Sequence, residues 1–351
     1  MSWVADIARP EIVALKPYKF AAWEPELTRL HANELPWRTP GDDSRGGLNR
    51  YPEPQPKALI ERLATLYEVA PGRILAARGS DEAIDLLIRT FCRPEVDAVL
   101  VCPPTFGMYM VAAQIQGAPV VSVPLRAADG FSLDEEAVLK AASSHVKIVF
   151  LCSPNNPTGN LLDPKSILRI VRKLAGRALV VVDEAYLEFA GAESLTKHVA
   201  RQSNLCVLRT LSKAHGLAGA RLGTLIADPE IVKLLRKVIA PYAITQLTIE
   251  AALRLLDPGS GPAREERLAM IRSERQRVSR TLSGLPLVKR VWPSAANFVL
   301  AEFRDAATAL ARARAARFLV RDARAYPELP ESLRITIGAS AQNTRLLQAW
   351  S

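Results

Sequence analysis

The stretch ALVVVDEAY, Ala178–Tyr186, sets a run of apolar, mostly β-branched residues directly before a carboxylate. A continuous apolar run such as Ala178–Val182 is typical of a strand that is buried on both faces. Similar runs recur along the chain, at Ala98–Cys102, Val120–Val123, Val146–Cys152, Leu205–Leu208 and Leu222–Ala227. Parallel sheets bind ligands where loops leave the carboxyl ends of their strands, and Asp183 lies at such an end.

Between several of these runs, apolar residues follow a helical spacing. Asp81 is a good N-cap for an amphipathic helix that extends to Cys92. Two further helical stretches cover Ser166–Leu174 and Ile231–Ile239. Strands that alternate with helices predict an α/β fold with a mainly parallel sheet, covered by helices on both faces.

The length of 351 residues suggests about two domains. The first fifty residues are rich in Pro, Gly and Arg and predict an irregular arm. After residue 248 a long charged helix precedes further elements: strands at Asn297–Phe303, Phe318–Val320 and Leu333–Ile337, and a helix over Asp305–Arg317. We therefore expect an N-terminal arm over residues 1–50 that forms part of the smaller domain, a large domain over 51–247 and a smaller α+β domain over 248–351.

The composition, with 49% hydrophobic and 23% charged residues, is that of a globular protein. No apolar stretch is long enough to span a bilayer and the N-terminus lacks the features of a signal peptide, so we expect a cytoplasmic protein. The four cysteines form no C-x-x-C pair and are expected in the core. A net charge of +10 leaves nucleic-acid binding open, but the dispersed basic residues favour solvated helix faces and anionic small molecules.

Lys213 follows the predicted strand Leu205–Leu208, among mostly apolar and small residues. Such surroundings lower the pKa of a lysine and make its amine a nucleophile toward aldehydes. Ser212 and Arg221 supply a hydroxyl and a guanidinium that suit a phosphate. The alternative is an ordinary surface lysine. The glycines do not have the spacing of a nucleotide-binding loop.

Three other strand ends carry polar or aromatic residues. The carboxylate of Asp183 needs a cationic or hydrogen-bonded partner if it is buried, although an N-cap role is the simpler alternative. The turn Ser153–Gly159 follows the strand that ends at Cys152. Gly79 and Ser80 precede the helix at Asp81, where exposed N–H groups bind phosphate readily. Phe106 follows Cys102 and serves either as core or as a stacking partner for a flat ring.

One ligand would use all of these groups. Pyridoxal phosphate needs an amine for its aldehyde, a carboxylate for its ring nitrogen, donors for its phenolate oxygen, a phosphate site and a stacking wall. The conjunction predicts a pyridoxal-phosphate site and no metal site.

With these motifs in place, the sequence resembles the fold-type-I aminotransferases, and within them the histidinol-phosphate branch. The motifs that carry the resemblance run in family order over nearly the whole chain: Arg50–Pro52, Arg78–Phe91, Cys102–Tyr109, Cys152–Gly159, Val181–Tyr186, Arg209–Gly223, Ala296–Phe298, Val320–Asp322 and Leu333–Gly338. The resemblance implies a large domain with a seven-stranded type of sheet and an amino transfer between histidinol phosphate and 2-oxoglutarate.

The resemblance also implies roles for single residues. Lys213 would hold the cofactor as a Schiff base and move the substrate proton, and Asp183 would pair with the ring nitrogen. Tyr186 would act with Asn156 on the phenolate oxygen. The remaining cofactor contacts are expected from Phe106 on the ring and from Gly79, Ser80, Asp81, Ser212 and Arg221 around the phosphate.

Further residues are implied at the substrate and at a subunit interface. The anionic end of the substrate would meet a set of arginines and polar residues, namely Tyr18, Asn33, Tyr109, Arg321 and Arg334. Two guanidiniums suit a phosphate that carries about −1.5 to −2 charges. Tyr51 would reach the cofactor of a neighbouring subunit, which makes a homodimer the functional unit.

The chain departs from the family pattern at three places. His215 replaces the usual phenylalanine, Phe106 replaces the commoner tyrosine, and Pro241–Thr245 differs from the usual sequence. The substitutions at His215 and Phe106, together with the similar ring-plus-anion substrates, keep an aromatic amino acid aminotransferase as the main alternative. A threonine-phosphate decarboxylase and a nucleic-acid-binding protein are the other two alternatives.

Overall fold

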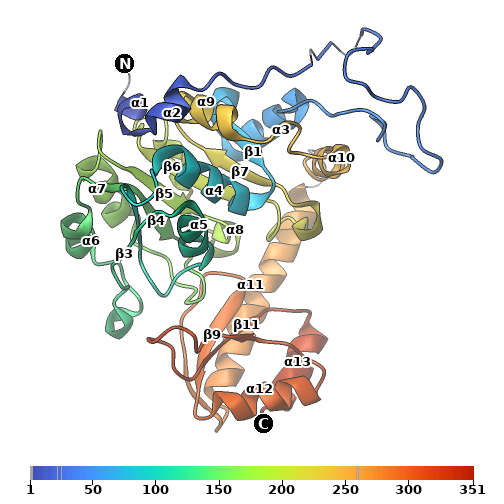
Figure 1. The fold of residues 1–351 in the computed structure, drawn as a ribbon. Coiled ribbons are helices and arrows are strands. Elements are labelled where there is room, and N and C mark those ends of the chain that lie inside the picture. The colour runs from blue at the N-terminus through green and yellow to red at the C-terminus, as the bar shows by residue number, and fades with distance from the viewer. Residues whose placement is uncertain (1–2, 22, 25, 258, 260) are drawn as a thin grey trace.

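The computed structural model describes residues 3–21, 23–24, 26–257, 259 and 261–351. Its main body is a seven-stranded sheet with the order β1-β7-β6-β5-β4-β2-β3 (Figure 1). The strands are β1 (Ile74–Ala77), β2 (Ala98–Val101), β3 (Val120–Ser122), β4 (Val146–Cys152), β5 (Leu179–Asp183), β6 (Leu205–Thr210) and β7 (Gly223–Ile226). Strands β3, β2, β4, β5 and β6 pair in parallel, whereas β7 is antiparallel to both of its neighbours.

Helices cover both faces of this sheet, and the strand β5 shows why. Val180 and Val182 belong to one apolar core, while Leu179 and Val181 belong to the other. The first core is closed by α3 (Lys57–Tyr67), α6 (Glu135–Ala141), α7 (Pro164–Lys173) and α10 (Gln246–Leu255). The second is closed by α4 (Gly79–Phe91), α5 (Met108–Gln116) and α9 (Pro229–Val238). A strand buried on both faces needs apolar residues at every position, as the sequence shows.

Some predicted elements differ from the observed ones. The helix predicted from Asp81 begins at Gly79, with Arg78 as its N-cap, so Asp81 lies in the first turn. A carboxylate in the first turn stabilises the helix through its attraction to the positive end of the helix dipole, without capping an N–H group. The segment predicted as a strand at Phe318–Val320 is irregular, and the short strand β10 (Arg321–Asp322) follows it. The strand β1, with the sequence ILAA, was not predicted because it is short and half alanine.

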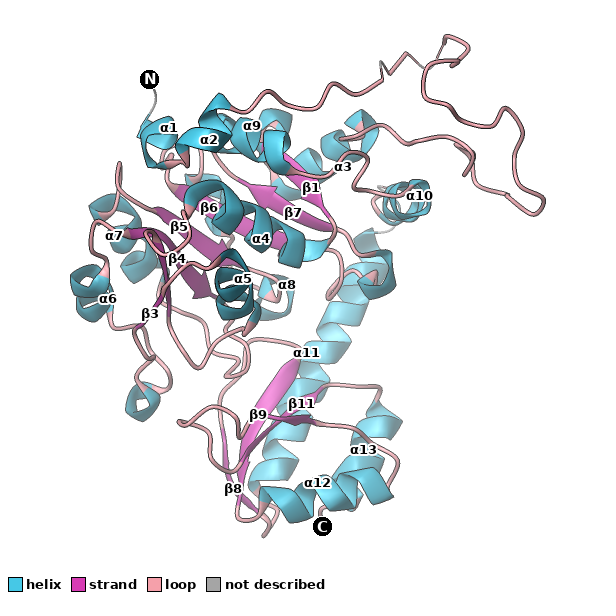
Figure 2. Ribbon diagram, viewed as in Figure 1, coloured by secondary structure: helices cyan, strands magenta, loops and turns pink. Residues whose placement is uncertain are grey.

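The C-terminal part contains a second, antiparallel sheet with the order β10-β11-β9-β8 (Figure 2). Its strands are β8 (Val288–Val291), β9 (Phe298–Phe303), β10 and β11 (Ser332–Thr336), and its helices are α11 (Gly261–Ser283), α12 (Ala306–Ala315) and α13 (Ser340–Gln348). These elements share an apolar core of their own, centred on Phe303 and Trp350. The long helix α11 connects the two sheets. The predicted boundary at 247/248 lies within α10.

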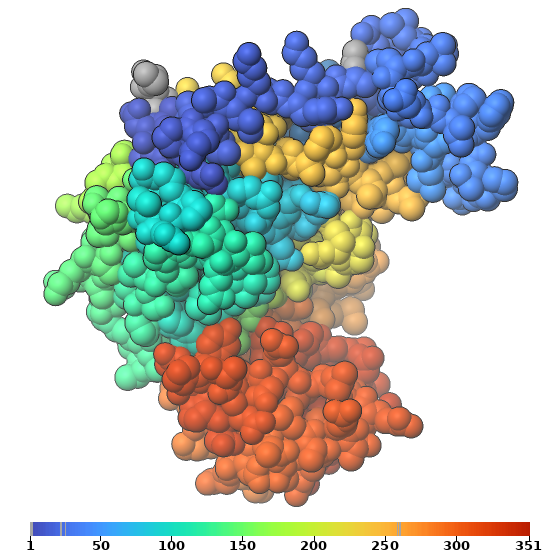
Figure 3. Space-filling model, in the orientation of Figure 1, coloured from blue at the N-terminus to red at the C-terminus, as the bar shows by residue number. Residues whose placement is uncertain are grey.

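The N-terminal segment begins with two short helices, α1 (Trp3–Ile7) and α2 (Pro10–Ala14). Val4, Ile7 and Ala8 pack into the core of the seven-stranded sheet. This packing differs from the expectation that the arm contributes to the smaller domain, because the apolar face of α1 is buried by the larger one. From residue 15 to α3 the described residues form no helix or strand, and the segment projects beyond the main body (Figure 3).

Candidate active site

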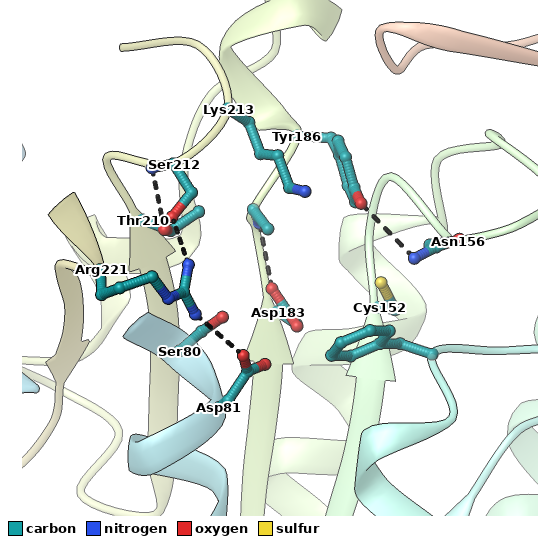
Figure 4. Close-up of a pocket in the computed structure, with 12 residues that line it drawn as sticks. Ser80, Asp81, Cys152, Asn156, Asp183, Tyr186, Thr210, Ser212, Lys213 and Arg221 are labelled. Carbon is teal, nitrogen blue, oxygen red and sulfur yellow. Dashed lines mark hydrogen bonds and ion pairs between the residues drawn. The ribbon is translucent and has the colours of Figure 1, made fainter. Parts of the chain in front are cut away.

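A pocket lies at the carboxyl ends of β4, β5 and β6 (Figure 4). Nine of the predicted cofactor residues line it: Ser80, Asp81, Phe106, Asn156, Asp183, Tyr186, Ser212, Lys213 and Arg221. Three residues that were not predicted also line it, namely Cys152, Ala185 and Thr210. The parallel arrangement of the strands therefore brings together side chains from five separate stretches of the sequence.

Asp183 is the last residue of β5 and is almost fully buried. Its Oδ2 accepts a hydrogen bond of 2.8 Å from the phenol of Tyr109, and its Oδ1 accepts one of 3.0 Å from the backbone N–H of Ala185. Burial raises the pKa of this carboxyl to about 6, although both hydrogen bonds oppose the rise. A buried carboxylate without a cation of its own is suited to a protonated ligand nitrogen.

Lys213 stands in the turn that follows β6, and its side chain projects into the pocket (Figure 4). The turn is closed by a hydrogen bond of 3.2 Å from the N–H of Gly216 to the carbonyl of Lys213. Desolvation and the nearby charge of Arg334 lower the pKa of the Lys213 ammonium. Among the described residues, no carboxylate lies within ion-pair distance of its Nζ. Such an amine is more readily deprotonated than an ordinary surface lysine.

Arg221 closes the pocket beside the N-terminus of α4. Its guanidinium donates hydrogen bonds to the Ser212 hydroxyl at 3.4 Å and to the Asp81 carboxylate at 3.1 Å. Gly79 has a φ of +79°, and a Cβ there would lie 2.7 Å from Nη2 of Arg221. A Cβ on Gly223 would lie 2.2 Å from the backbone of Gly79. The two glycines therefore permit a close approach of backbone N–H groups, a guanidinium and a hydroxyl, which together suit a phosphate.

Tyr186 and Asn156 form the opposite wall. The Asn156 amide donates to the Tyr186 hydroxyl at 3.4 Å and accepts a hydrogen bond from the guanidinium of Arg334. Arg334 lies on β11, opposite Arg321 on β10. The pocket wall is therefore linked directly to the four-stranded sheet, where two guanidiniums are neighbours.

Tyr109 occupies a place that differs from its prediction. It was expected to contact substrate, but its ring is fully buried beneath the pocket and stacks on Phe150, with centroids 4.8 Å apart. Its ring also meets that of Phe106 edge to face at 5.6 Å. Phe106 precedes α5 and lines the pocket, whereas Tyr109 lies in the first turn of that helix and donates to Asp183 from beneath the pocket. The structure therefore places Tyr109 against Asp183 and away from the lining.

The three predicted residues of the arm lie outside this pocket. Tyr18 and Tyr51 are exposed by 65% and 49% of their surfaces, and Tyr51 stacks on Tyr242 with a centroid distance of 4.6 Å. Asn33 lines a different surface hollow together with Tyr51. Within one chain these residues do not meet Lys213.

His215 does not line this pocket either. It is buried behind the Lys213 turn, with Nε2 3.4 Å from a carboxylate oxygen of Glu188. Glu188 in turn pairs with Arg209, which also holds Glu184, the residue after Asp183. These four charged or titratable residues fix the two strand ends behind the pocket.

Neither a metal site nor a membrane span is found in the described part of the chain. No group of three or more His, Cys, Asp or Glu residues there could hold a metal ion. No described helix is both long and apolar enough to cross a bilayer.

The sequence profile of the family named aminotransferase class I and II matches residues 29–349. The chain belongs to this aminotransferase family. Relatives of this aminotransferase include the histidinol-phosphate aminotransferase of Stenotrophomonas maltophilia (strain R551-3), which is 47% identical over 99% of the chain and 96% of the relative. The histidinol-phosphate aminotransferase of Xanthomonas axonopodis pv. citri (strain 306) is also 47% identical, over 99% of the chain and 97% of the relative.

Solved structures show the same fold as this aminotransferase. The histidinol-phosphate aminotransferase from Clostridium acetobutylicum matches with a TM-score of 0.79 and 23% identity, over 86% of the chain and 90% of its own length. The one from Sinorhizobium meliloti, in complex with pyridoxal-5'-phosphate, matches with a TM-score of 0.77 and 25% identity, over 87% and 83%. The expected fold-type-I α/β architecture is confirmed.

The pocket of this aminotransferase fits pyridoxal phosphate, the cofactor of the family. Three features seen in the structure support the fit: the buried carboxylate of Asp183 and the amine of Lys213, neither of which has an ion-pair partner among the described residues, and the close approach of Gly79 to Arg221. These features are donors and acceptors of the kinds that the ring nitrogen, aldehyde and phosphate require.

Proposed function

We propose that the protein transfers an amino group between L-histidinol phosphate and 2-oxoglutarate, as a pyridoxal-phosphate-dependent aminotransferase. The observation that carries the proposal is that Lys213 and the buried Asp183 share one pocket, with the Arg321–Arg334 pair joined to its wall. The curated relatives that carry this name are 47% identical over almost the full length.

Each group of pocket residues has a proposed part in holding the cofactor. Asp183 would pair with the ring nitrogen, Tyr186 and Asn156 would contact the phenolate oxygen, and Phe106 would cover the ring. The phosphate would be held by Gly79, Ser80, Ser212 and Arg221, with Asp81 orienting the guanidinium of Arg221. When bound, pyridoxal phosphate supplies an aldehyde for amines and a ring that takes up the electron pair left at the substrate carbon.

Lys213 has two proposed tasks that both depend on a neutral amine. It would attach the cofactor through Nζ, and it would then move the proton at the substrate carbon. The lowered pKa of its ammonium favours the neutral form that both tasks require. Asp183, in its ionised form, would keep the ring nitrogen protonated.

The two arginines would bind the anionic end of either substrate. Arg334 is partly buried, and its Nε, which is itself buried, has no hydrogen-bond partner within the described residues. A guanidinium binds carboxylate and phosphate in the same bidentate way, so one site suits both substrates. Tyr18 and Asn33 would complete this site from the arm of a second subunit.

A homodimer is part of this proposal. The arm exposes apolar side chains that a single chain leaves uncovered, including Leu30, Leu35, Trp37 and Leu48. Large exposed apolar surfaces mark contacts between proteins. Tyr51, which does not reach the pocket of its own chain, would contact the phosphate in the partner's pocket. Sedimentation of the purified protein tests the dimer, and a monomer with full activity would contradict it.

The decisive assay compares kcat/KM for L-histidinol phosphate with kcat/KM for phenylalanine, with 2-oxoglutarate as the acceptor. The proposal predicts a clear preference for histidinol phosphate, because a dianionic phosphate engages two guanidiniums more strongly than a carboxylate does. A preference for phenylalanine would establish the aromatic aminotransferase instead. Release of carbon dioxide would indicate a decarboxylase. Of the two substitutions behind the aromatic alternative, only Phe106 faces the pocket, so His215 gives that alternative no support.

A further inference from the structure

The hairpin that carries the two arginines is embedded in the larger part of the molecule at its tip. Residues 323–331 connect β10 to β11, and Ala323 and Leu329 of this loop are 2% and 1% exposed. Both belong to the core of the seven-stranded sheet, whereas Leu333 and Ile335 of β11 belong to the core of the four-stranded sheet. The loop therefore joins two units with separate cores.

Tyr326, in the middle of this loop, makes a directed contact with the cofactor pocket. Its hydroxyl donates a hydrogen bond of 2.7 Å to the backbone carbonyl of Thr105, the residue before Phe106. The Thr105 hydroxyl donates to the Asn155 side chain at 3.0 Å, and the Asn155 amide donates to the carbonyl of Pro104 at 2.8 Å. Tyr326 is thus attached to the rigid pair of loops that present Phe106 and Asn156.

The same tyrosine lies close to the arginines. Arg321 and Arg334 face each other across β10 and β11, the two strands that the Tyr326 loop connects. Burial raises the pKa of the Tyr326 phenol above its ordinary value, and the charges of Arg321 and Arg334 oppose part of that rise. The phenol consequently remains a donor near neutral pH. One hydrogen bond therefore spans from the arginine hairpin to the loop that presents Phe106.

We propose that Tyr326 is a positioning residue that holds the Arg321–Arg334 pair at a set distance from the Phe106 wall and so determines how tightly the anionic end of the substrate is bound. This inference rests on the proposed function in assuming that these arginines bind that anion. Without the bond to Thr105, the hairpin tip would keep its apolar anchors but lose the contact that fixes its direction.

The test is Tyr326→Phe, which keeps the ring and removes only the hydroxyl. We expect the KM for the amino donor and for 2-oxoglutarate to rise about fivefold, the typical value of one net hydrogen bond, with kcat changed less than about twofold. The inhibition constant of inorganic phosphate should rise by a similar factor. Cofactor affinity should stay as in the unaltered protein, and Tm should fall by no more than about 4 °C. Hydrogen exchange should become faster at the amides of β10 and β11.

Arg324→Gln is the matched control, because Arg324 lies in the same loop and, among the described residues, forms an ion pair with Asp322 alone. It should leave every one of these quantities unchanged. Unchanged KM values in Tyr326→Phe would overturn the proposal, and so would a parallel loss of cofactor affinity, which would indicate a general structural role. If histidinol phosphate is not a donor, the proposed function fails, but the KM for 2-oxoglutarate and the phosphate inhibition still test Tyr326.

Discussion

Tyr109 donates a hydrogen bond of 2.8 Å to the carboxylate of Asp183 from beneath the pocket, and a second donor, the N–H of Ala185, holds the other oxygen. The two bonds leave the carboxylate one orientation. Burial raises the pKa of the Tyr109 phenol well above its usual value, so this group stays protonated and remains a donor. The direction of Asp183 is therefore held in part by a residue that lies beneath the pocket and is not among its lining residues.

Replacing Tyr109 by phenylalanine should weaken cofactor binding. The ring would keep its contacts with Phe150 and Phe106, but Asp183 would lose a bond that lowers its pKa, so its ionised form would become less populated. We expect the dissociation constant of pyridoxal phosphate to rise about fivefold, the typical value of one net hydrogen bond. An absorbance titration measures it. An unchanged constant would show that Asp183 needs no support from Tyr109.

Asp183 should make the cofactor-free protein less stable as pH rises. Its carboxyl has a pKa of about 6 in the folded chain, against the ordinary value of 3.8, so the folded state holds the proton more tightly. The stability from this group is present below about pH 4 and is lost as pH rises through about 6, a change of about 3 kcal/mol. Urea unfolding of the unaltered protein and of Asp183→Asn at several pH values isolates the contribution of Asp183 to the free energy of unfolding, since the two proteins share all other titrating groups.

Asp183→Asn should also greatly slow turnover, because asparagine offers the ring nitrogen of the cofactor no negative charge. A kcat near that of the unaltered enzyme would refute the role of Asp183. Cofactor binding to the unaltered protein should also strengthen as pH rises through about 6, and Asp183→Asn should lack that dependence.

Gly223→Ala should distort the proposed phosphate site, although Gly223 does not line the pocket. The added methyl group would lie 2.2–2.3 Å from backbone atoms of Gly79 and Ser80, and these cannot move without displacing the start of α4. We expect a loss of about 2 kcal/mol in unfolding free energy, together with weaker cofactor binding. Gly219→Ala is the control, because a Cβ there meets no atom within 4 Å. Equal Tm values for the two variants would contradict the close approach.

Arg334→Ala should act mainly on substrate binding. A hydrogen bond to a charged group contributes about 2 kcal/mol, so kcat/KM should fall about 30-fold for the donor and for 2-oxoglutarate. Arg321→Ala should have a smaller effect, because Arg321 is exposed and bonds no residue of the pocket wall, whereas Arg334 bonds Asn156. The reverse order of the two effects would show that the anion is held chiefly by Arg321.

The sheet was largely predictable from apolar runs, and its exceptions have physical causes. The strand β4 matches the predicted Val146–Cys152 at both ends, because six of its seven residues are apolar or cysteine and only Lys147 interrupts the run. The direction of β7 could not be predicted, since a short buried strand has the same composition in either direction. The strand β1 was not predicted from the sequence because Ala76 and Ala77 have little preference for strands.

The pocket was predictable where residues follow strand ends, as Asp183 and Lys213 do. It was not predictable where function depends on the direction of a side chain. Tyr109 lies three residues after Phe106 but faces Asp183, and only the helix geometry of α5 reveals this. Tyr326 carries no motif, and its contact with Thr105 spans 221 positions of sequence.

The most direct measurement is reductive trapping at Lys213. Purified protein incubated with pyridoxal phosphate should become yellow, and borohydride followed by peptide mapping should place the cofactor on Nζ of Lys213. Lys213→Ala should remain folded, with a Tm close to that of the unaltered protein, yet trap nothing and transfer no amino group. A colourless protein, or a label on another lysine, would contradict the central role of Lys213.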